Sequence, residues 1–433
     1  MSPERRRAHA LIVQHGWNST SFQVLEDGYQ YWFWGDEACV AYVDTGRAWV
    51  VAGAPIAPEA QLGEVVTRFL EEAQRAGRRV CFFAVEARLL AQTALRGLPI
   101  GEQAVWDPRG WSGVLAGAKS LREQLRRARA KGVTVRRLTV DELEHHGPAL
   151  DGLAERWLAG RALAPLGFLV ELELFRDPHQ RRYFVAEQGG RVVGALTAVP
   201  VYAREGWLLE DLLRDASAPN GTAELLVDAA MTTLAAEGSS YVTLGLAPLS
   251  GELPRPLALA REVTRPLYDF HGLRAFKAKL RPERWDPIYL AYERAPVRAV
   301  LDALRAFARG SLRAFVLRTI LRGPTPVVLA LGLALLPWTV LLALAPTTPW
   351  FVSRAVQWAW VAFDLGLTAG LLALARRWRR WLGLTLAALV TADALLTLAI
   401  AVLWNGPRAR GPLDVLVLLV ACAAPAAGAA ILW

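Results

Sequence analysis

One short segment places charges of both signs in a strand that otherwise looks buried. Glu210 and Asp211 precede two leucines, and Arg214 follows them. Burying such charges is costly unless they are paired or take part in chemistry. The segment is therefore a candidate functional site, and a structural ion pair is the alternative interpretation.

Lysine is rare in this chain, and two lysines stand almost side by side. Only Lys119, Lys131, Lys277 and Lys279 occur among 49 basic residues. Lysine is a compact donor whose pKa shifts readily on burial, which arginine does not share. The pair at 277 and 279 hints that an amine is needed there, although chance pairing is the alternative.

A turn with an Asn-Gly step precedes an apolar helical pattern. Asn220-Gly221 permits a positive φ, Thr222 can cap the helix, and a helix N-terminus offers free N–H groups to an anion. An ordinary capped loop is the alternative. Downstream, residues 244–251 run from a strand into a turn of small residues, where Ser250 is a weaker candidate for bonding a substrate.

A strongly basic helical segment spans residues 119–131, with Glu123 as its one acid. It is the best candidate for contact with a nucleic-acid backbone or lipid headgroups, and a merely solvated face is the alternative. Its six cations are Lys119, Arg122, Arg126, Arg127, Arg129 and Lys131. The global charge of +9 adds no support, because residues 1–299 hold 37 basic against 36 acidic residues.

The elements that position these residues alternate between strands and helices. The patterns predict helices over Leu62–Ala76, Ser120–Ala130 and Thr222–Glu237, and a tight hairpin turn at Gln188–Arg191. Strands are predicted at Cys39–Val43, Ala48–Ala52, Arg79–Val85, Tyr183–Glu187, Val192–Tyr202, Trp207–Leu213 and Tyr241–Leu246. This order is found in acyltransferases of the N-acetyltransferase (GNAT) type, one of several α/β folds that the pattern allows. The loop that cradles coenzyme A in ordinary acetyltransferases is absent, which argues against a coenzyme A donor.

The last quarter of the chain is apolar enough for a bundle of about four transmembrane helices. The predicted spans are Pro326–Ala345, Ala355–Ala375, Leu382–Trp404 and Leu413–Trp433. Arginines flank the first span and separate the second from the third, so both termini are predicted to be cytosolic. The N-terminus lacks the apolar stretch of a signal peptide, in agreement with a cytosolic first domain. Asp364 and Asp393 fall near the middle of two spans and should each face a partner or a wet cavity.

The predicted architecture is thus α/β, with a tandem GNAT-like acyltransferase fold followed by an α-helical transmembrane bundle. The boundaries are 1–112 for the first GNAT-like subdomain, 113–295 for the second, catalytic one, 296–325 for a basic amphipathic juxtamembrane linker and 326–433 for the four-helix region. For the linker, a helix that packs on the soluble domain is the alternative. Scattered Cys39, Cys81 and Cys422 suggest neither a disulfide framework nor a zinc site.

From about His15 to Tyr292 the chain resembles the catalytic domain of bacterial aminoacyl-phosphatidylglycerol synthases, the phosphatidylglycerol lysyltransferase or multiple peptide resistance factor family. The matching motifs are GAPIAP at 53–58, KSLREQLRRARAKGVTV at 119–135, DLLR, APNGT, LGLAPLSG at 244–251, LYDFHGLRAFKAKL at 267–280 and YLAY at 289–292. The family's Pro-Arg-Tyr-Leu appears here as Pro287-Ile288-Tyr289-Leu290, with one charge fewer.

The resemblance implies a tRNA-dependent aminoacyltransferase that modifies phosphatidylglycerol, an activity linked to antimicrobial peptide resistance. It places catalytic roles on Asp211, Arg214, Lys277 and Lys279. Asp211 would orient the donor's ammonium group or act as base, Arg214 would hold the lipid phosphate, and a lysine would steady the oxyanion or the tRNA phosphates. Substrate contacts are expected at Asn220, Gly221, Thr222, Ser250, Arg274 and Tyr289.

The expected partners are aminoacyl-tRNA and an anionic, phosphatidylglycerol-containing inner (cytoplasmic) membrane that the chain crosses several times. No metal or cofactor is needed, because the aminoacyl ester is already activated. Two alternatives remain open: a same-fold transferase with another lipid or a peptidoglycan precursor as acceptor, and a non-catalytic membrane sensor or scaffold.

Overall fold

The computed structural model describes residues 2–161, 166–265, 268–320, 324–376, 379–409 and 411–432. It divides into two compact units, one of Met1–Arg161 with Pro165–Phe315 and one dominated by Val316–Trp433. The motif residue Leu267, the flanking arginines 322, 377 and 410, and the terminal Trp433 lie outside the described residues.

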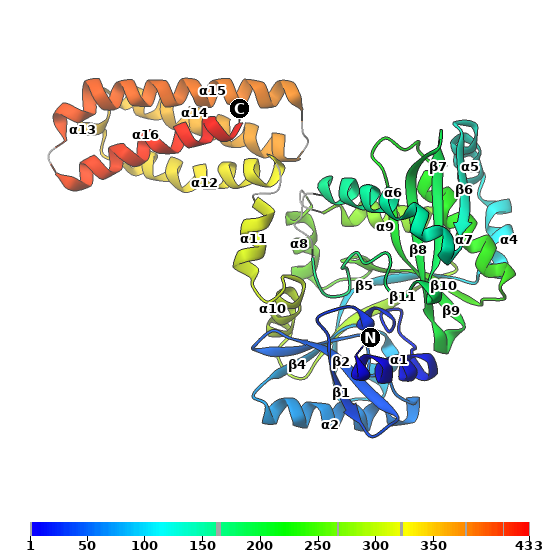
Figure 1. Ribbon diagram of the computed structural model, residues 1–433. Helices are drawn as coiled ribbons and strands as arrows, with labels where there is room; N and C mark the ends of the chain where they lie inside the picture. The colour runs from blue at the N-terminus through cyan, green and yellow to red at the C-terminus, as the bar shows by residue number, and fades with distance from the viewer. Residues whose placement is uncertain are drawn as a thin grey trace. The chain divides into compact units, whose positions relative to one another are not determined.

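The first unit is built on one sheet of eleven strands (Figure 1), in the order β1-β2-β3-β4-β11-β5-β10-β9-β8-β7-β6. The strands are β1 Gln30–Trp34, β2 Ala38–Asp44, β3 Ala48–Ala52, β4 Arg79–Val85, β5 Arg96–Trp106, β6 Val133–Leu138, β7 Arg182–Gln188, β8 Arg191–Val201, β9 Gly206–Arg214, β10 Tyr241–Pro248 and β11 Arg284–Tyr292. The predicted strands are confirmed to within one or two residues. The hairpin is confirmed too, since Gln188 pairs with Arg191 and both turn glycines have positive φ.

Helices cover both faces of this sheet. They are α1 Pro3–His15, α2 Leu62–Arg75, α3 Ala87–Ala91, α4 Trp111–Gly117, α5 Lys119–Ala130, α6 Val140–Ala159, α7 Thr222–Ala236, α8 Arg255–Val263, α9 Phe270–Lys279 and α10 Pro296–Phe307. In the first half, α2 packs on one face while α1 and α10 pack on the other. In the second half, α5 and α7 share one core, and α6 shares another.

The two halves repeat one local arrangement. In each, a strand, a loop and a helix lead to a parallel neighbouring strand: β3 to β4 through α2, and β9 to β10 through α7. This gives the tandem GNAT-like fold. The halves also exchange strands, because β11 lies between β4 and β5, and β5 lies between β11 and β10.

The segment predicted as a juxtamembrane linker contains two helices. They are separated at Gly310, which has φ +86° between α10 and α11 (Leu312–Ile320). Ala299, Ala303 and Ala306 of α10 are buried in the core that also contains β3 and β4 residues. The inner face of residues 296–307 therefore packs on the first unit, as the alternative interpretation expected, and the exposed outer face leaves the prediction of a juxtamembrane linker open.

The second unit holds the apolar helices α12 Pro324–Leu344, α13 Thr347–Trp350, α14 Arg354–Arg376, α15 Arg380–Ile400 and α16 Pro412–Leu432. Within the described residues, four segments are long and apolar enough to cross a membrane: Val327–Leu344, Arg354–Arg376, Trp381–Arg408 and Asp414–Leu432. They match the predicted spans closely. Asp364 on α14 and Asp393 on α15 are only 4% and 9% exposed, so both point into the bundle.

Candidate functional site

A β-bulge in β9 places two carboxylates beside each other. Thr197 of β8 pairs with Asp211, and the next residue, Ala198, pairs with Leu209, so Glu210 has no partner residue opposite it. The extra residue bends the strand locally and redirects its side chains. The Thr197 hydroxyl donates a hydrogen bond to the Asp211 carboxylate at 2.7 Å.

The carboxyl group of Asp211 has a strongly raised pKa. Burial raises its pKa to about 7, the nearby Glu210 carboxylate raises it further, and the Thr197 hydrogen bond and Arg181 act in the opposite direction. A carboxyl group that titrates near neutral pH is suited to general base catalysis.

Further carboxylates surround this strand, and they come from distant parts of the sequence. Glu26, only 5% exposed, follows a short 3₁₀ segment in the first half. Burial raises the pKa of Glu26 to about 9, with added repulsion from Glu210 and Glu173. Glu210 is held by the buried Arg181, and one of its oxygens has no hydrogen-bond partner in the described part of the chain.

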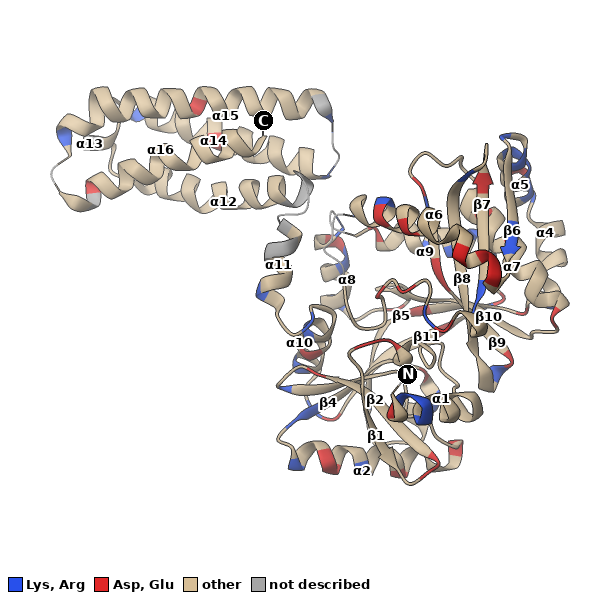
Figure 2. Ribbon diagram, in the orientation of Figure 1, with Lys and Arg blue, Asp and Glu red and all other residues tan. Residues whose placement is uncertain are grey.

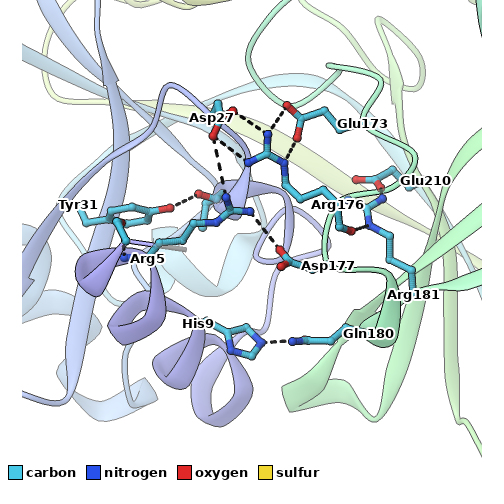
Figure 3. A network of polar contacts seen from close by, with 12 residues as sticks. Arg5, His9, Asp27, Tyr31, Glu173, Arg176, Asp177, Gln180, Arg181 and Glu210 are labelled. Carbon is cyan, nitrogen blue, oxygen red and sulfur yellow. Dashed lines mark hydrogen bonds and ion pairs between the residues drawn. The ribbon is translucent and has the colours of Figure 1, made fainter. Parts of the chain in front are cut away.

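The loop before β7 carries Glu173, Arg176 and Arg181, whose polar contacts Figure 3 shows together with Glu210. Arg176 bonds Glu173 at 2.7 Å and forms a bidentate pair with Asp27 at 2.7 and 2.8 Å. Arg5 of α1 reaches Asp177 at 3.1 Å. We define the acid cluster as Glu26, Glu173, Glu210 and Asp211. These contacts connect the first half of the unit to the loop that carries Glu173 of this cluster.

Arg214 lies apart from Asp211, although it is three residues away. Successive strand side chains point to opposite faces, so the two residues face opposite sides of the sheet. Arg214 is exposed and bonds the exposed Asn220 side chain at 3.3 Å, next to the start of α7.

The start of α7 is tightly built against α5. Gly221 has φ +99°, and a Cβ there would lie 2.7 Å from the Gln124 carbonyl oxygen, so only glycine fits. The cap prediction for Thr222 is wrong: Gly221 is the N-cap, and the buried Thr222 hydroxyl donates to the Pro219 carbonyl at 2.7 Å. Lys279 also lies here, in an ion pair with the buried Glu224 of the first turn of α7.

The other predicted site residues have structural partners. Lys277, 3% exposed, donates to the carbonyls of residues 244, 245 and 246 at 2.8, 2.8 and 2.9 Å, so its three donors are in use beside a bulge in β10. Burial lowers its pKa to about 7. Ser250 is buried and donates to the Ala247 carbonyl. Arg274 pairs with Glu102 at 3.2 Å, and Tyr289 packs in the core beneath α2.

Figure 2 shows basic positions along α5; their side chains are exposed, while Leu121, Leu125 and Ala128 are buried beneath them. Arg126 and Arg127 share Glu123 at 2.8 and 2.9 Å, and Arg129 pairs with Asp228. Six cations against one acid of its own leave a strongly positive surface next to the start of α7. Arg122 folds back onto the carbonyls of Leu115 and Ala116, and Lys119 and Lys131 are exposed.

The predicted residues thus form two groups. Asp211 belongs to the acid cluster, whereas Arg214, Asn220, Gly221, Thr222 and Lys279 gather at the start of α7 beside α5. Sequence reasoning missed Glu26, Glu173, Arg181 and Thr197. Of these four residues, only Arg181 could have been noticed in the sequence, because its charge stands next to the apolar strand β7.

Most of the first unit is similar in sequence to known proteins. A family model described as "Phosphatidylglycerol lysyltransferase, C-terminal" matches residues 9–292. A phosphatidylglycerol lysyltransferase of Bacillus subtilis (strain 168) is 27% identical over 312 residues, which is 66% of this chain and 35% of the relative. The chain therefore spans about a third of the length of that relative.

Two solved structures share the fold of the first unit. One is the C-terminal domain of a putative lysylphosphatidylglycerol synthetase from Agrobacterium fabrum, with a TM-score of 0.62 and 24% identity over 71% of this chain and 98% of that one. The other is L-PGS from Bacillus licheniformis, with a TM-score of 0.60 and 23% identity over 71% and 97%.

Proposed function

Because the chain belongs to the family of phosphatidylglycerol lysyltransferase C-terminal domains, we propose that it transfers an aminoacyl group from aminoacyl-tRNA to the headgroup hydroxyl of phosphatidylglycerol. The reaction would take place at the cytosolic face of a membrane that the chain crosses several times. The observation that carries the proposal is Asp211, a carboxyl group with a pKa of about 7 in a partly buried acid cluster.

The proposed reaction is an exchange of esters. The lipid hydroxyl oxygen attacks the aminoacyl carbonyl carbon as Asp211 accepts the hydroxyl proton. The bond to the terminal ribose oxygen of the tRNA then breaks, and that oxygen takes up a proton. Because the aminoacyl ester is already activated, no ATP is consumed, and a base that is half ionised at neutral pH matches the demand of the first step.

The acid cluster also favours one class of donor. Among the described residues, the four carboxyl groups Glu26, Glu173, Glu210 and Asp211 lie with two guanidinium groups, Arg176 paired with Glu173 and Arg181 paired with Glu210. Burial is the main cause that raises the pKa values of Glu26 and Asp211, and repulsion among the carboxylates adds to it, which a positively charged ligand would relieve. We therefore expect a cationic amino acid, with its ammonium groups among these carboxylates.

The second group of residues has the charge that a tRNA requires. The cations of α5 lie next to the start of α7, where the exposed Arg214 adds one more and Lys279 is paired with Glu224. Positive side chains that release counterions from phosphates supply most non-specific affinity for nucleic acids. We assign this surface, Arg214 included, to the phosphate backbone of the tRNA, while the aminoacyl end must reach the acid cluster on the other face of the sheet.

The test is lipid analysis of cells that express the chain, its Asp211→Ala variant and its Asp107→Asn variant. Asp107 is a surface carboxylate paired with Arg109 in its own turn, so it controls for the loss of an acid. An aminoacylated phosphatidylglycerol is expected by mass spectrometry with the parent and with Asp107→Asn, but not with Asp211→Ala. Its mass would identify the amino acid.

The other outcomes separate the alternatives. A different aminoacylated lipid or peptidoglycan precursor that depends on Asp211 would keep the transferase and change the acceptor. No new product, with the protein folded in the membrane of a host that supplies every charged tRNA, would favour a sensor or scaffold.

A further inference from the structure

Helix α10 has two different apolar faces. Its inner face is made of small residues, Ala299, Ala303 and Ala306, which pack on the sheet. Its outer face carries Val297, Leu301 and Leu304, which are 71%, 38% and 48% exposed. Residues at these spacings lie in one stripe along a helix, so the large apolar side chains form a continuous outward surface.

Charge on this helix is divided between the same faces. The one acid of α10, Asp302, is 2% exposed and points inward, where Arg79 holds it at 2.8 Å. Arg305 also bonds Asp302, at 2.8 Å, and Arg298 flanks the stripe with no ion pair among the residues described. The outer face is therefore apolar with a positive edge and has no acid of its own.

The position of α10 in the chain limits what can cover this face. α10 ends at Phe307, and the first candidate span begins at Val327. Nine residues of the connection are helical in α11 at about 1.5 Å each, so α10 must stay within a few tens of ångströms of the bilayer. Helices with an apolar stripe flanked by basic residues bind in the interface of anionic membranes.

We propose that the outer face of α10 docks on the anionic surface of the bilayer and fixes which side of the sheet faces the lipid. The Asp302 pair with Arg79 locks the helix to β4, so docking would orient the whole first unit. The unit would then present the α1 and α10 face to the membrane and the α2 face to water. This inference concerns location and holds whether or not the chain transfers an aminoacyl group.

The far end of α10 also reaches the wall of the acid cluster. Phe307 packs edge-on against Phe168 and Phe83, with ring centroids 5.3 and 4.9 Å apart, and Gly167 donates to the Phe307 carbonyl at 3.0 Å. Arg309 forms an ion pair with Glu171. The loop that carries Glu173 and Arg176 is thus attached to the helix that would lie on the lipid.

The experiment uses the full chain, with Cys422→Ser, in vesicles of phosphatidylcholine and phosphatidylglycerol that contain a headgroup-quencher lipid. Cys39 and Cys81 are buried and should resist labelling. A fluorophore is attached to Leu301→Cys, to Val297→Cys or, as control, to Thr67→Cys on the exposed side of α2. Thr67 suits the control because α2 packs on the opposite face of the sheet, so the two faces cannot touch one bilayer together.

Lipid quenching at positions 297 and 301 should exceed that at 67 by at least about twofold, and it should fall when phosphatidylglycerol is left out. Two positions guard against one substitution disturbing the helix. Equal quenching at all three positions would overturn the proposal. The proposal would also be overturned if the label at position 301 were shielded from water but not quenched by lipid, because a second copy of the chain would then cover this face.

Discussion

Asp211 has its raised pKa because of how β9 is built around it. The bulge at Glu210 brings a second carboxylate next to it, and both lie where water is scarce. A single hydrogen bond from Thr197 at 2.7 Å is the main local contact that favours the ionised form. The pKa of Asp211, the proposed base, therefore depends on Thr197, which can be replaced while Asp211 is kept.

Replacing Thr197 with valine should move the pH dependence of transfer. Loss of the hydroxyl raises the pKa of Asp211, so less of the base is ionised at pH 7 and the rate there falls. The acidic limb of kcat/KM should move upward by roughly one pH unit, since a hydrogen bond to a charged group is worth about 1.5–3 kcal/mol. Asp211→Asn, by contrast, should lose about 10²–10⁴-fold at every pH. An unmoved limb in Thr197→Val would show that Asp211 is not the titrating base.

Glu26 should make the first unit less stable as pH rises. Its carboxyl has a pKa of about 9 in the folded protein and near 4.5 in the unfolded chain. Between these values the unfolded chain has lost the proton and the folded protein keeps it, so each rise in pH favours unfolding. Glu26→Gln removes this dependence.

The melting temperature of Glu26→Gln should therefore exceed that of the parent by an amount that grows between pH 5.5 and pH 8.5, on the order of several °C. Near-UV circular dichroism of the full chain in detergent follows the transition. Glu64→Gln, an exposed carboxyl change on α2, should track the parent at both pH values. A constant difference between Glu26→Gln and the parent would contradict the assignment.

At this scale the sequence could reveal Asp211 because its charge interrupts a local apolar pattern. It could not reveal Glu26 or Glu173, since they reach the cluster through the folding of segments far apart in the chain. The lysine pair was visible as composition, but composition could not tell that Lys277 serves three carbonyls of β10 while Lys279 pairs with Glu224. Predictions for the site residues thus remain strongest for Asp211 and for the group around Arg214.

Among the elements, seven strands could be predicted from their apolar or alternating residues, whereas β1, β5, β6 and β11 were missed. β5 contains Gly97, Pro99 and Gly101, which read as a loop, yet it lies in the middle of the sheet. A Cβ at Gly101 would lie 2.3 Å from the Ala247 carbonyl oxygen, so the glycine allows β5 and β10 to approach. The exchange of β5 and β11 between the halves is set by long-range pairing, which no local pattern encodes.

The element that most directly tests the tRNA proposal is α5. Replacing Lys119, Arg126, Arg127 and Lys131 with serine removes exposed cations and leaves the buried leucines in place. The dissociation constant for tRNA should rise by about tenfold or more, and the dependence of log K on log salt should become shallower by roughly 0.7–0.9 for each phosphate that the helix no longer neutralises. Binding titrations between about 50 and 200 mM salt measure both.

The matched control for α5 replaces Arg68 and Arg75 of α2 with serine. These are also exposed arginines that pair with glutamates on their own helix, Glu64, Glu71 and Glu72. Their loss should leave tRNA affinity and salt dependence nearly unchanged. The α5 set removes four cations and the control removes two, so a control effect about half as large would show that the contact depends on total charge and not on α5.

For the whole molecule, the proposed reaction requires both substrates on one side of the membrane. Because charged tRNA is cytosolic, the proposed reaction would require the first unit and its α5 surface to be cytosolic as well. The arginines agree with this: Arg313 and Arg318 precede the first span and Arg376, Arg379 and Arg380 flank the second and third, while Arg354 and Arg408 lie at the opposite ends. Four spans then return the C-terminus to the cytosol.

Cysteine labelling in intact cells checks this orientation. In the Cys422→Ser background, Ser353→Cys lies in an exposed segment between α13 and α14 and should react with a membrane-impermeant maleimide before the cells are opened. Thr67→Cys on α2 should react only after permeabilisation. The reverse pattern would place the first unit outside the cell, where no charged tRNA can reach Asp211. That result would exclude the proposed reaction, and the acid cluster would then need another function. The topology of the bundle therefore tests the chemistry of a residue that lies in the other unit.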